Sequence, residues 1–213
     1  MVAYSTADRV ALGKIKNFAL LGIVGIILGF VIPLFTLDSA LGLASVSTAT
    51  ISSVANIVEI YSAIAIVGVA IGIVSIVMVR SAFKTLAPVD SQFGTPSTMV
   101  LGMFAAMVLA IVAVIALIGF AFSIASQVAA NPGVTPNFSG ILVFSGLIIL
   151  AGISWLVGII GIILGLWRTG TRYNEGLLKI GGIFYIIPLL DIVAPILVYL
   201  GASSAEKKVG QPA

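Results

Sequence analysis

The distribution of charged residues is the feature that most restricts what this chain of 213 residues can fold into. No charged residue occurs between Asp90 and Arg168, a run of 77 residues, and only 8% of the whole chain is charged. Soluble domains carry about 25% charged residues, so the composition excludes an ordinary water-soluble fold. It also excludes intrinsic disorder, which requires low hydrophobicity and high charge. The sequence therefore predicts an integral membrane protein.

Uncharged gaps define the membrane-spanning helices. Two shorter gaps contain 21 and 20 residues, each about the length of one transmembrane helix. The long gap holds two helices, because the turn-forming cluster 131–137 divides it. Long apolar runs without alternation satisfy their backbone groups as helices, not as barrel strands. We predict an all-α, polytopic membrane helix bundle, with its first four spans near residues 17–37, 57–79, 98–128 and 139–167.

A fifth apolar stretch, near 177–200, contains two prolines. Pro188 and Pro195 each remove a backbone donor, and Asp191 lies between them. The stretch is predicted to be one Pro-kinked span or a re-entrant pair of half-helices, with the kinked span favoured. About five transmembrane helices would then form a single domain over residues 1–205, followed by a short polar tail, 206–213.

Positive charges occur on alternate connections between these spans. The positive-inside rule therefore places the amino terminus of this multi-pass protein, which we expect in the cell membrane, in the cytoplasm. Five crossings place the carboxyl terminus outside, where Lys207 and Lys208 do not fit the rule. A re-entrant last segment removes that conflict. The positive residues that set the orientation are Arg9, Lys14, Lys16, Arg80, Lys84, Arg168, Arg172 and Lys179.

The third and fourth spans are longer than a bilayer requires. At 1.5 Å per residue they reach roughly 45 Å, against a hydrocarbon core of about 30 Å. They must tilt, lie in a thick membrane or project beyond it. Projection exposes apolar surface to water unless another subunit covers it, and this favours assembly.

A glycine pattern recurs along the chain. The string GIVGIILGF at 22–30 returns as GIIGIILGL at 158–166, with seven of nine positions identical, and a weaker copy covers 65–73. Small residues spaced three and four apart share a helix face and let neighbouring helices approach closely. Chance recurrence in a glycine-rich chain is the alternative. The predicted helix-packing glycines are Gly22, Gly25, Gly29, Gly68, Gly72, Gly158, Gly161 and Gly165.

Two carboxylates are the candidates for ion binding. Asp191 lies within an apolar segment between prolines, and a carboxylate inside a bilayer is costly enough to suggest a function. Glu59 could approach it, and two close carboxylates bind a cation or share a proton. The structural alternative is that Asp191 caps a half-helix and Glu59 lies at the interface. Asn137 begins a glycosylation acceptor pattern, which also occurs by chance.

Other chemistry lacks its residues in this sequence. The chain has neither Cys nor His, and it carries no phosphate-binding loop, dinucleotide fingerprint, metal-binding pair or nucleophile elbow. We therefore expect no catalytic residue, no metal, no cofactor and no enzyme activity. The small net charge of +3 follows from the orientation signals, so we expect no nucleic-acid partner.

Three segments resemble a known family. They are GKIKNFALL at 13–21, RYNEGLLKIGGIFYIIP at 172–188 and IVAPILVYLG at 192–201. They resemble an archaeal family of multi-span membrane proteins of unknown function, called domain of unknown function 973. The resemblance implies an archaeal membrane and an uncharacterised activity, with no site residue to carry over.

The leading expectation for function is an integral membrane structural or assembly protein. It would self-associate or act as an accessory subunit of a larger membrane complex, with membrane lipid and other membrane subunits as partners. The alternative is a small transporter or channel for a cation or proton that uses the intramembrane carboxylates.

Overall fold

The structure is a computed structural model that describes residues 4–45, 51–130, 139–187 and 189–210, with the backbone alone for residues 30–45, 51–65 and 130. Helices make up nearly all of these ranges, and no strand occurs within them. The prediction of an all-α fold is confirmed. Among the described residues, four helices are long and apolar enough to cross a membrane.

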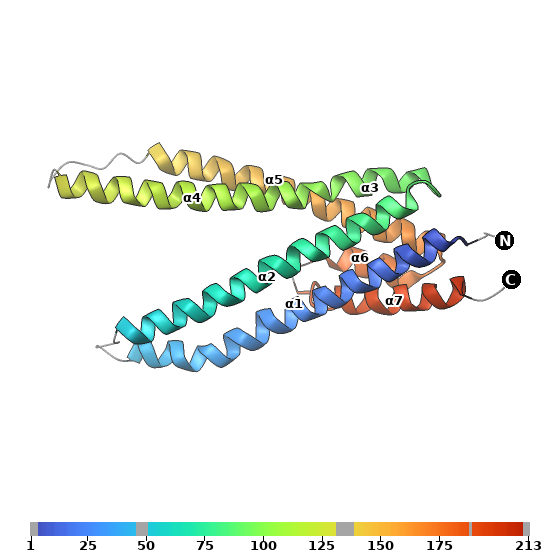
Figure 1. The fold of residues 1–213 in the computed structure, drawn as a ribbon, viewed down its shortest axis with the longest axis horizontal. Helices are drawn as coiled ribbons and strands as arrows, with labels where there is room; N and C mark the ends of the chain where they lie inside the picture. Colours follow the sequence, from blue (N-terminus) through green and yellow to red (C-terminus); the bar gives the residue numbers. More distant parts are fainter. Residues whose placement is uncertain (1–3, 46–50, 131–138, 188, 211–213) are drawn as a thin grey trace.

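Two long helical hairpins dominate the molecule. The first consists of α1 (Thr6–Ser45) and α2 (Ile51–Leu86), and the second of α4 (Leu101–Ala130) and α5 (Ser139–Arg172). Figure 1 shows that the hairpins pack together at one end and diverge toward the other. We call the packed part the closed end (residues 4–19, 76–100, 158–184 and 194–210). The diverging parts are the α1–α2 arm (20–45 and 51–75) and the α4–α5 arm (101–130 and 139–157).

The connection between the hairpins lies at the closed end. Asp90 caps the short helix η1 (Ser91–Phe93) by accepting a hydrogen bond from the Gln92 backbone N–H at 3.0 Å. The six-residue helix α3 (Gly94–Met99) follows, and a turn at Val100 leads directly into α4. The apolar segment therefore extends from Ser91 to Ala129.

The fifth apolar stretch forms two short antiparallel helices, α6 (Gly176–Phe184) and α7 (Ala194–Val209). A Cβ on Gly181 would lie 2.8 Å from Val198, and one on Gly201 would lie 2.9 Å from the backbone N of Leu178. The earlier residue of α6 thus pairs with the later residue of α7, and this antiparallel order requires a hairpin. The structure thus has the re-entrant alternative in place of the favoured kinked span. Pro195 lies in the first turn of α7, where a missing N–H costs nothing.

The hairpin corrects the expected position of the carboxyl terminus. Lys16 in α1 contacts Glu206 in α7 at 2.9 Å, so both ends of the chain lie at the closed end (Figure 1). The expectation that they lie on opposite sides of the membrane depended on a single fifth span, and α6 and α7 form a hairpin in its place. Residues 206–209, the first part of the predicted polar tail, form the last turn of α7.

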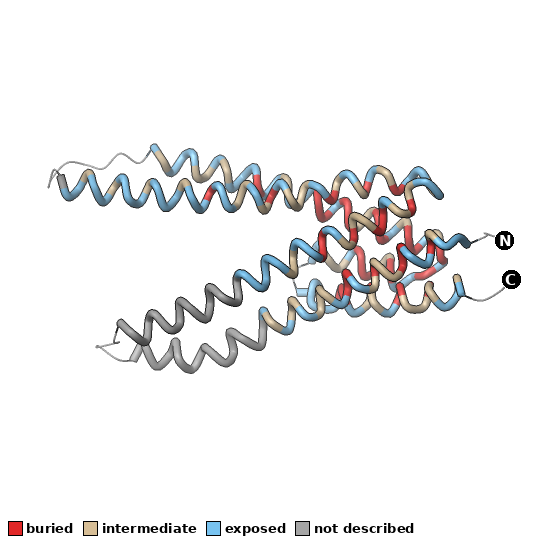
Figure 2. The backbone as a smooth tube through the Cα atoms, viewed as in Figure 1, coloured by how far each residue is buried: buried red, intermediate tan, exposed pale blue. Residues whose placement is uncertain are grey.

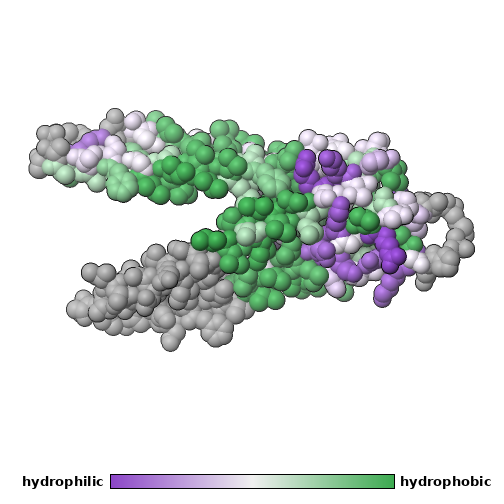
Figure 3. All heavy atoms as spheres, in the orientation of Figure 1, coloured by the Kyte–Doolittle hydropathy of each residue, from purple (hydrophilic) through white to green (hydrophobic). Residues whose placement is uncertain are grey.

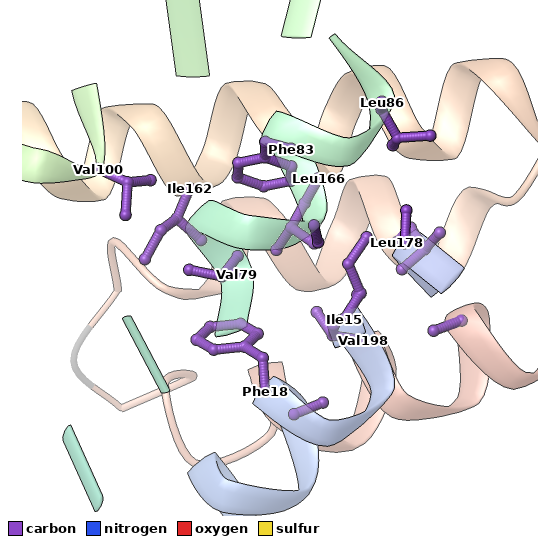
Figure 4. Close-up of a cluster of buried hydrophobic side chains, with 14 of the residues drawn as sticks. Ile15, Phe18, Val79, Phe83, Leu86, Val100, Ile162, Leu166, Leu178 and Val198 are labelled. Carbon is purple, nitrogen blue, oxygen red and sulfur yellow. The ribbon is translucent and has the colours of Figure 1, made fainter. Parts of the chain in front are cut away.

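The hydrophobic core occupies the closed end. Figure 4 shows side chains from α1, α2, α5, α6 and α7 meeting there, with Phe83 and Leu166 near the centre. The rings of Phe83 and Phe93 stack with their centroids 6.3 Å apart. Figure 2 shows that buried residues become sparse along the described part of both arms. Packing contacts therefore hold the closed end together, while the arms present apolar surface that suits lipid.

Candidate functional site

All ten Lys and Arg residues belong to the closed end or its immediate border, and hydrophilic residues gather there in Figure 3. They come from the first turns of α1, the last turns of α2 and α5, and from α6 and α7. The return of the chain through α7 brings Lys207 and Lys208 to the same end as the other eight. The coloured parts of the arms expose mainly apolar residues in the same view, so the polar cluster of the closed end is the candidate site.

A fully buried carboxylate lies at the centre of this cluster. Asp8 has no exposed surface and accepts hydrogen bonds from Arg172 Nε at 2.7 Å and from Tyr173 Oη at 2.5 Å. The Ser5 backbone N–H and Oγ also donate to Asp8, at 2.7 and 2.8 Å. Ser5 and Asp8 form a capping pair at the start of α1, because they stand three residues apart. The same carboxylate thus caps α1 and joins it to the end of α5.

The turn after α5 positions two of these partners. Asn174 has φ 52°, in the left-handed region, and it follows directly on Tyr173. The Glu175 N–H donates to the Gly170 carbonyl at 2.7 Å, and the Asn174 N–H donates to the Thr171 carbonyl at 3.3 Å. These two bonds form a Schellman motif, which ends the helix and redirects the chain. The motif presents Tyr173 to Asp8 and places Glu175 at the start of α6.

A second ion pair fixes α7 against this turn. Lys208 Nζ lies 2.6 Å from Glu175 Oε1, and Ser204 Oγ donates to the same oxygen at 2.7 Å. Burial raises the pKa of the Glu175 carboxyl, and the hydrogen bonds from Lys208 and Ser204 lower it. The lowering is larger, so the net pKa is below the ordinary value. Burial and the hydrogen bond to Asp8 raise the pKa of Tyr173, which therefore stays protonated as a donor.

Acid is expected to destabilise the fold through Glu175. A carboxyl whose pKa is lower in the folded state stabilises above its unfolded pKa, and this stabilisation is lost as the pH falls through the folded value. The free energy of unfolding in detergent should therefore decrease as the pH falls below about 4.5, the ordinary pKa of the group. The Glu175→Gln variant should show a shallower decrease than the natural chain. Identical pH profiles would contradict the assigned pair.

The predicted ion-binding carboxylates are not joined by any described contact. Asp191 lies exposed in the turn between α6 and α7. Glu59 lies in α2, and its side chain is outside the described residues. A Cβ built on Gly25 of α1 would have Ile71 of α2 as its nearest neighbour. Glu59 lies twelve residues from Ile71 toward the start of α2, about 18 Å along the helix axis. Their pairing stays a prediction. Asn137, the predicted glycosylation acceptor, also lies outside the described residues.

The predicted packing glycines fall into two groups. A Cβ on Gly158, Gly161 or Gly165 would lie 2.1 to 2.7 Å from atoms of Met103, Met99 or Phe83, respectively. A Cβ on Gly22 would lie 3.0 Å from the side chain of Pro195, and a Cβ on Gly25 would lie 3.9 Å from the side chain of Ile71. The three remaining glycines have no described neighbour within 4 Å of the Cβ position. They are Gly29, Gly68 and Gly72.

Sequence reasoning did not find the Asp8–Arg172 pair or the Glu175–Lys208 pair. The signal available was local: Ser5 and Asp8 have capping spacing, but their partners lie more than 160 residues away along the chain. In chemical terms the described carboxylates of the two pairs are neutralised by cations. No group of three or more Asp or Glu side chains that could hold a metal ion occurs in the described part of the chain.

Comparison with known proteins identifies a family. The model of a family described as "Protein of unknown function (DUF973)" matches residues 8–212. No curated protein and no solved structure matches the chain. The matched region begins at the buried carboxylate of Asp8 and extends past the end of α7, so it contains the three ion pairs and all of the four long helices except the first two residues of α1. The chain therefore belongs to the DUF973 family of proteins of unknown function.

Proposed function

We propose that this chain is a structural or assembly protein of the cell membrane that self-associates through its α4–α5 arm. The observation that supports this is the length and exposure of that arm. The segment from Ser91 to Ala129 has only 11% of its most apolar window buried within the chain. The two helices of the arm contain 30 and 34 residues, about 45 and 51 Å in length.

The length matters because the closed end fixes the depth of the arm. With Arg168 at the headgroup level, a helix tilted by about 20° crosses a 30 Å core in roughly 21 residues. Residues 139–146 of α5 then lie beyond the hydrocarbon. Leu142 and Val143 in this part are 76% and 60% exposed. A second copy packed on the arm would cover this apolar surface, which neither water nor headgroups solvate well.

The proposal includes an orientation and a negative statement. With ten positive residues at one end, the positive-inside rule places the closed end in the cytoplasm. We propose no enzyme activity, because three carboxylates of the closed end, Asp8, Glu175 and Glu206, are held in ion pairs that tie helices together. An accessory role in a larger membrane complex would use the same surface of the α4–α5 arm. The family resemblance implies that this membrane is archaeal.

Cation or proton transport is the second candidate. It is supported by Asp191, a carboxylate in the turn of a re-entrant hairpin that receives no side-chain hydrogen bond from the described residues. Two half-helices meeting at such a turn resemble the discontinuous helices of transporter ion sites. The paired carboxylate that transport requires is still a prediction, so the structural role has more support.

The self-association proposal is tested by cross-linking single cysteines in membranes. The chain has no Cys, so each introduced thiol is unique. Ile149→Cys on α5 and Ile66→Cys on α2 are matched, because they are 63% and 71% exposed and lie at similar distances from the closed end. We expect an oxidant to produce covalent dimers of Ile149→Cys and far fewer of Ile66→Cys. Equal yields, or a particle of 21.9 kDa protein mass in mild detergent, would contradict the proposal.

A further inference from the structure

An apolar groove opens at the fork between α2 and the α4–α5 arm. It has a volume of about 500 Å³, within the usual range of ligand pockets of roughly 300–1,000 Å³. Ile76 lines it from α2, Met103 and Met107 from α4, and Ile148 and Trp155 from α5. Alanines and Gly152 complete a wall with almost no polar surface.

The depth of the groove indicates what fills it. Ile76 lies two turns inward from Lys84, about 12 Å along α2, and Trp155 lies about 20 Å inward from Arg168 along α5. With those cations at the headgroup level, the groove opens into hydrocarbon. A lipid chain is the solvent at this depth, and it matches a wall of Met, Ile and Trp side chains.

A cation without a partner lies one turn above the groove. Arg80 is four residues from Ile76, so the two share a face of α2, with Arg80 nearer the closed end. Its Nε atom is buried and has no hydrogen-bond partner, and the described residues give Arg80 no ion pair. Four other cations of the closed end each contact an oxygen of the protein: Lys14, Lys16, Arg172 and Lys208.

A partly buried guanidinium without a partner among the described residues is costly, and its two terminal Nη groups carry donors that suit a phosphate in two-point contact. The apolar groove and the unpaired cation together match the two halves of one molecule. We propose that this site binds an anionic membrane phospholipid, with one acyl chain in the groove and the phosphate on Arg80. All residues of the site belong to one chain, so a monomeric chain could still bind the lipid.

The test is lipid-dependent thermal stability of the full chain in detergent. Phosphatidylglycerol should raise the melting temperature in a saturable manner, whereas phosphatidylcholine and inorganic phosphate should not. Arg80→Gln should weaken the apparent affinity by about tenfold or more, the effect of one charge-assisted contact. Lys84→Gln is the matched control, because Lys84 is an exposed cation one turn away and should leave the affinity unchanged.

A second variant addresses the groove without touching the cation. Gly152 lines the groove and has no neighbour within 4 Å of its Cβ position, so the backbone accommodates a Cβ there, and we expect the ring of Gly152→Phe to fill the groove. The variant should fold and lose the response to phosphatidylglycerol. An equal response in either variant would overturn the proposal. A response to inorganic phosphate alone would show that Arg80 binds a free anion. An equal response to phosphatidylcholine would show that the charge of the lipid has no role. Either result would also overturn the proposal.

Discussion

Replacing Asp8 by asparagine is expected to reduce the free energy of unfolding by about 3 kcal/mol or more, the cost of removing one partner from a buried ion pair. Asp8 has no exposed surface and accepts bonds from Arg172, Tyr173 and Ser5. An amide has one acceptor oxygen and no charge, so the Arg172 guanidinium, with a side chain only 12% exposed, loses its counter-ion. Denaturant or thermal unfolding in detergent measures the change.

The Lys16–Glu206 pair is the matched control for Asp8. It joins α1 to α7 at the same end of the molecule, but its side chains are 30% and 29% exposed. Exposed pairs contribute about 0–1 kcal/mol, so Glu206→Gln should change stability little. Equal effects of Asp8→Asn and Glu206→Gln would show that the Asp8 cluster is not the polar centre of the fold.

Replacing Gly165 by alanine is expected to destabilise the closed end by about 2 kcal/mol, a typical cost of overpacking a core. The new Cβ would lie 2.1 Å from the ring of Phe83, a side chain with no exposed surface. Phe83 itself packs against Phe93, so the ring has little room to move. The melting temperature in detergent should fall, and the closed end should become more accessible to protease.

Gly72→Ala is the control for this prediction. Gly72 belongs to the weaker copy of the same glycine pattern, but no described atom lies within 4 Å of its Cβ position. The substitution should leave the melting temperature unchanged or slightly higher. A comparable loss in both variants would mean that glycine content, and not the contact with Phe83, determines stability.

The four long helices could be predicted from the sequence because lipid imposes a local rule. Every backbone group in hydrocarbon must be satisfied within its own segment, so uncharged stretches of sufficient length become helices. The glycine pattern illustrates the limit of such local evidence. Gly158–Gly165 and Gly22–Gly29 stand in nearly identical strings, yet a Cβ would clash at Gly165 and meets nothing described at Gly29. The difference arises from the neighbouring helix, which the string does not encode.

The last segment shows a similar limit. Residues 177–200 are long enough to cross a bilayer, so length favoured a single span over a hairpin. The close approaches of Gly181 to Val198 and of Gly201 to Leu178 decide for the hairpin, and they depend on pairing between distant positions. The positive charges of Lys207 and Lys208 were the local signal that a single span leaves unexplained. Arg172 and Asp8 are likewise 164 residues apart, beyond any local pattern.

The sidedness of three cysteine variants tests the central arrangement most directly. Thr6→Cys marks the start of α1, Lys207→Cys marks the end of α7, and Ala129→Cys marks the end of α4, at the far end of the α4–α5 arm. We expect a membrane-impermeant maleimide to label Thr6→Cys and Lys207→Cys only in inside-out vesicles, and Ala129→Cys only in right-side-out vesicles. Labelling of Thr6→Cys and Lys207→Cys from opposite faces would establish a fifth crossing and contradict the hairpin on which the closed end depends.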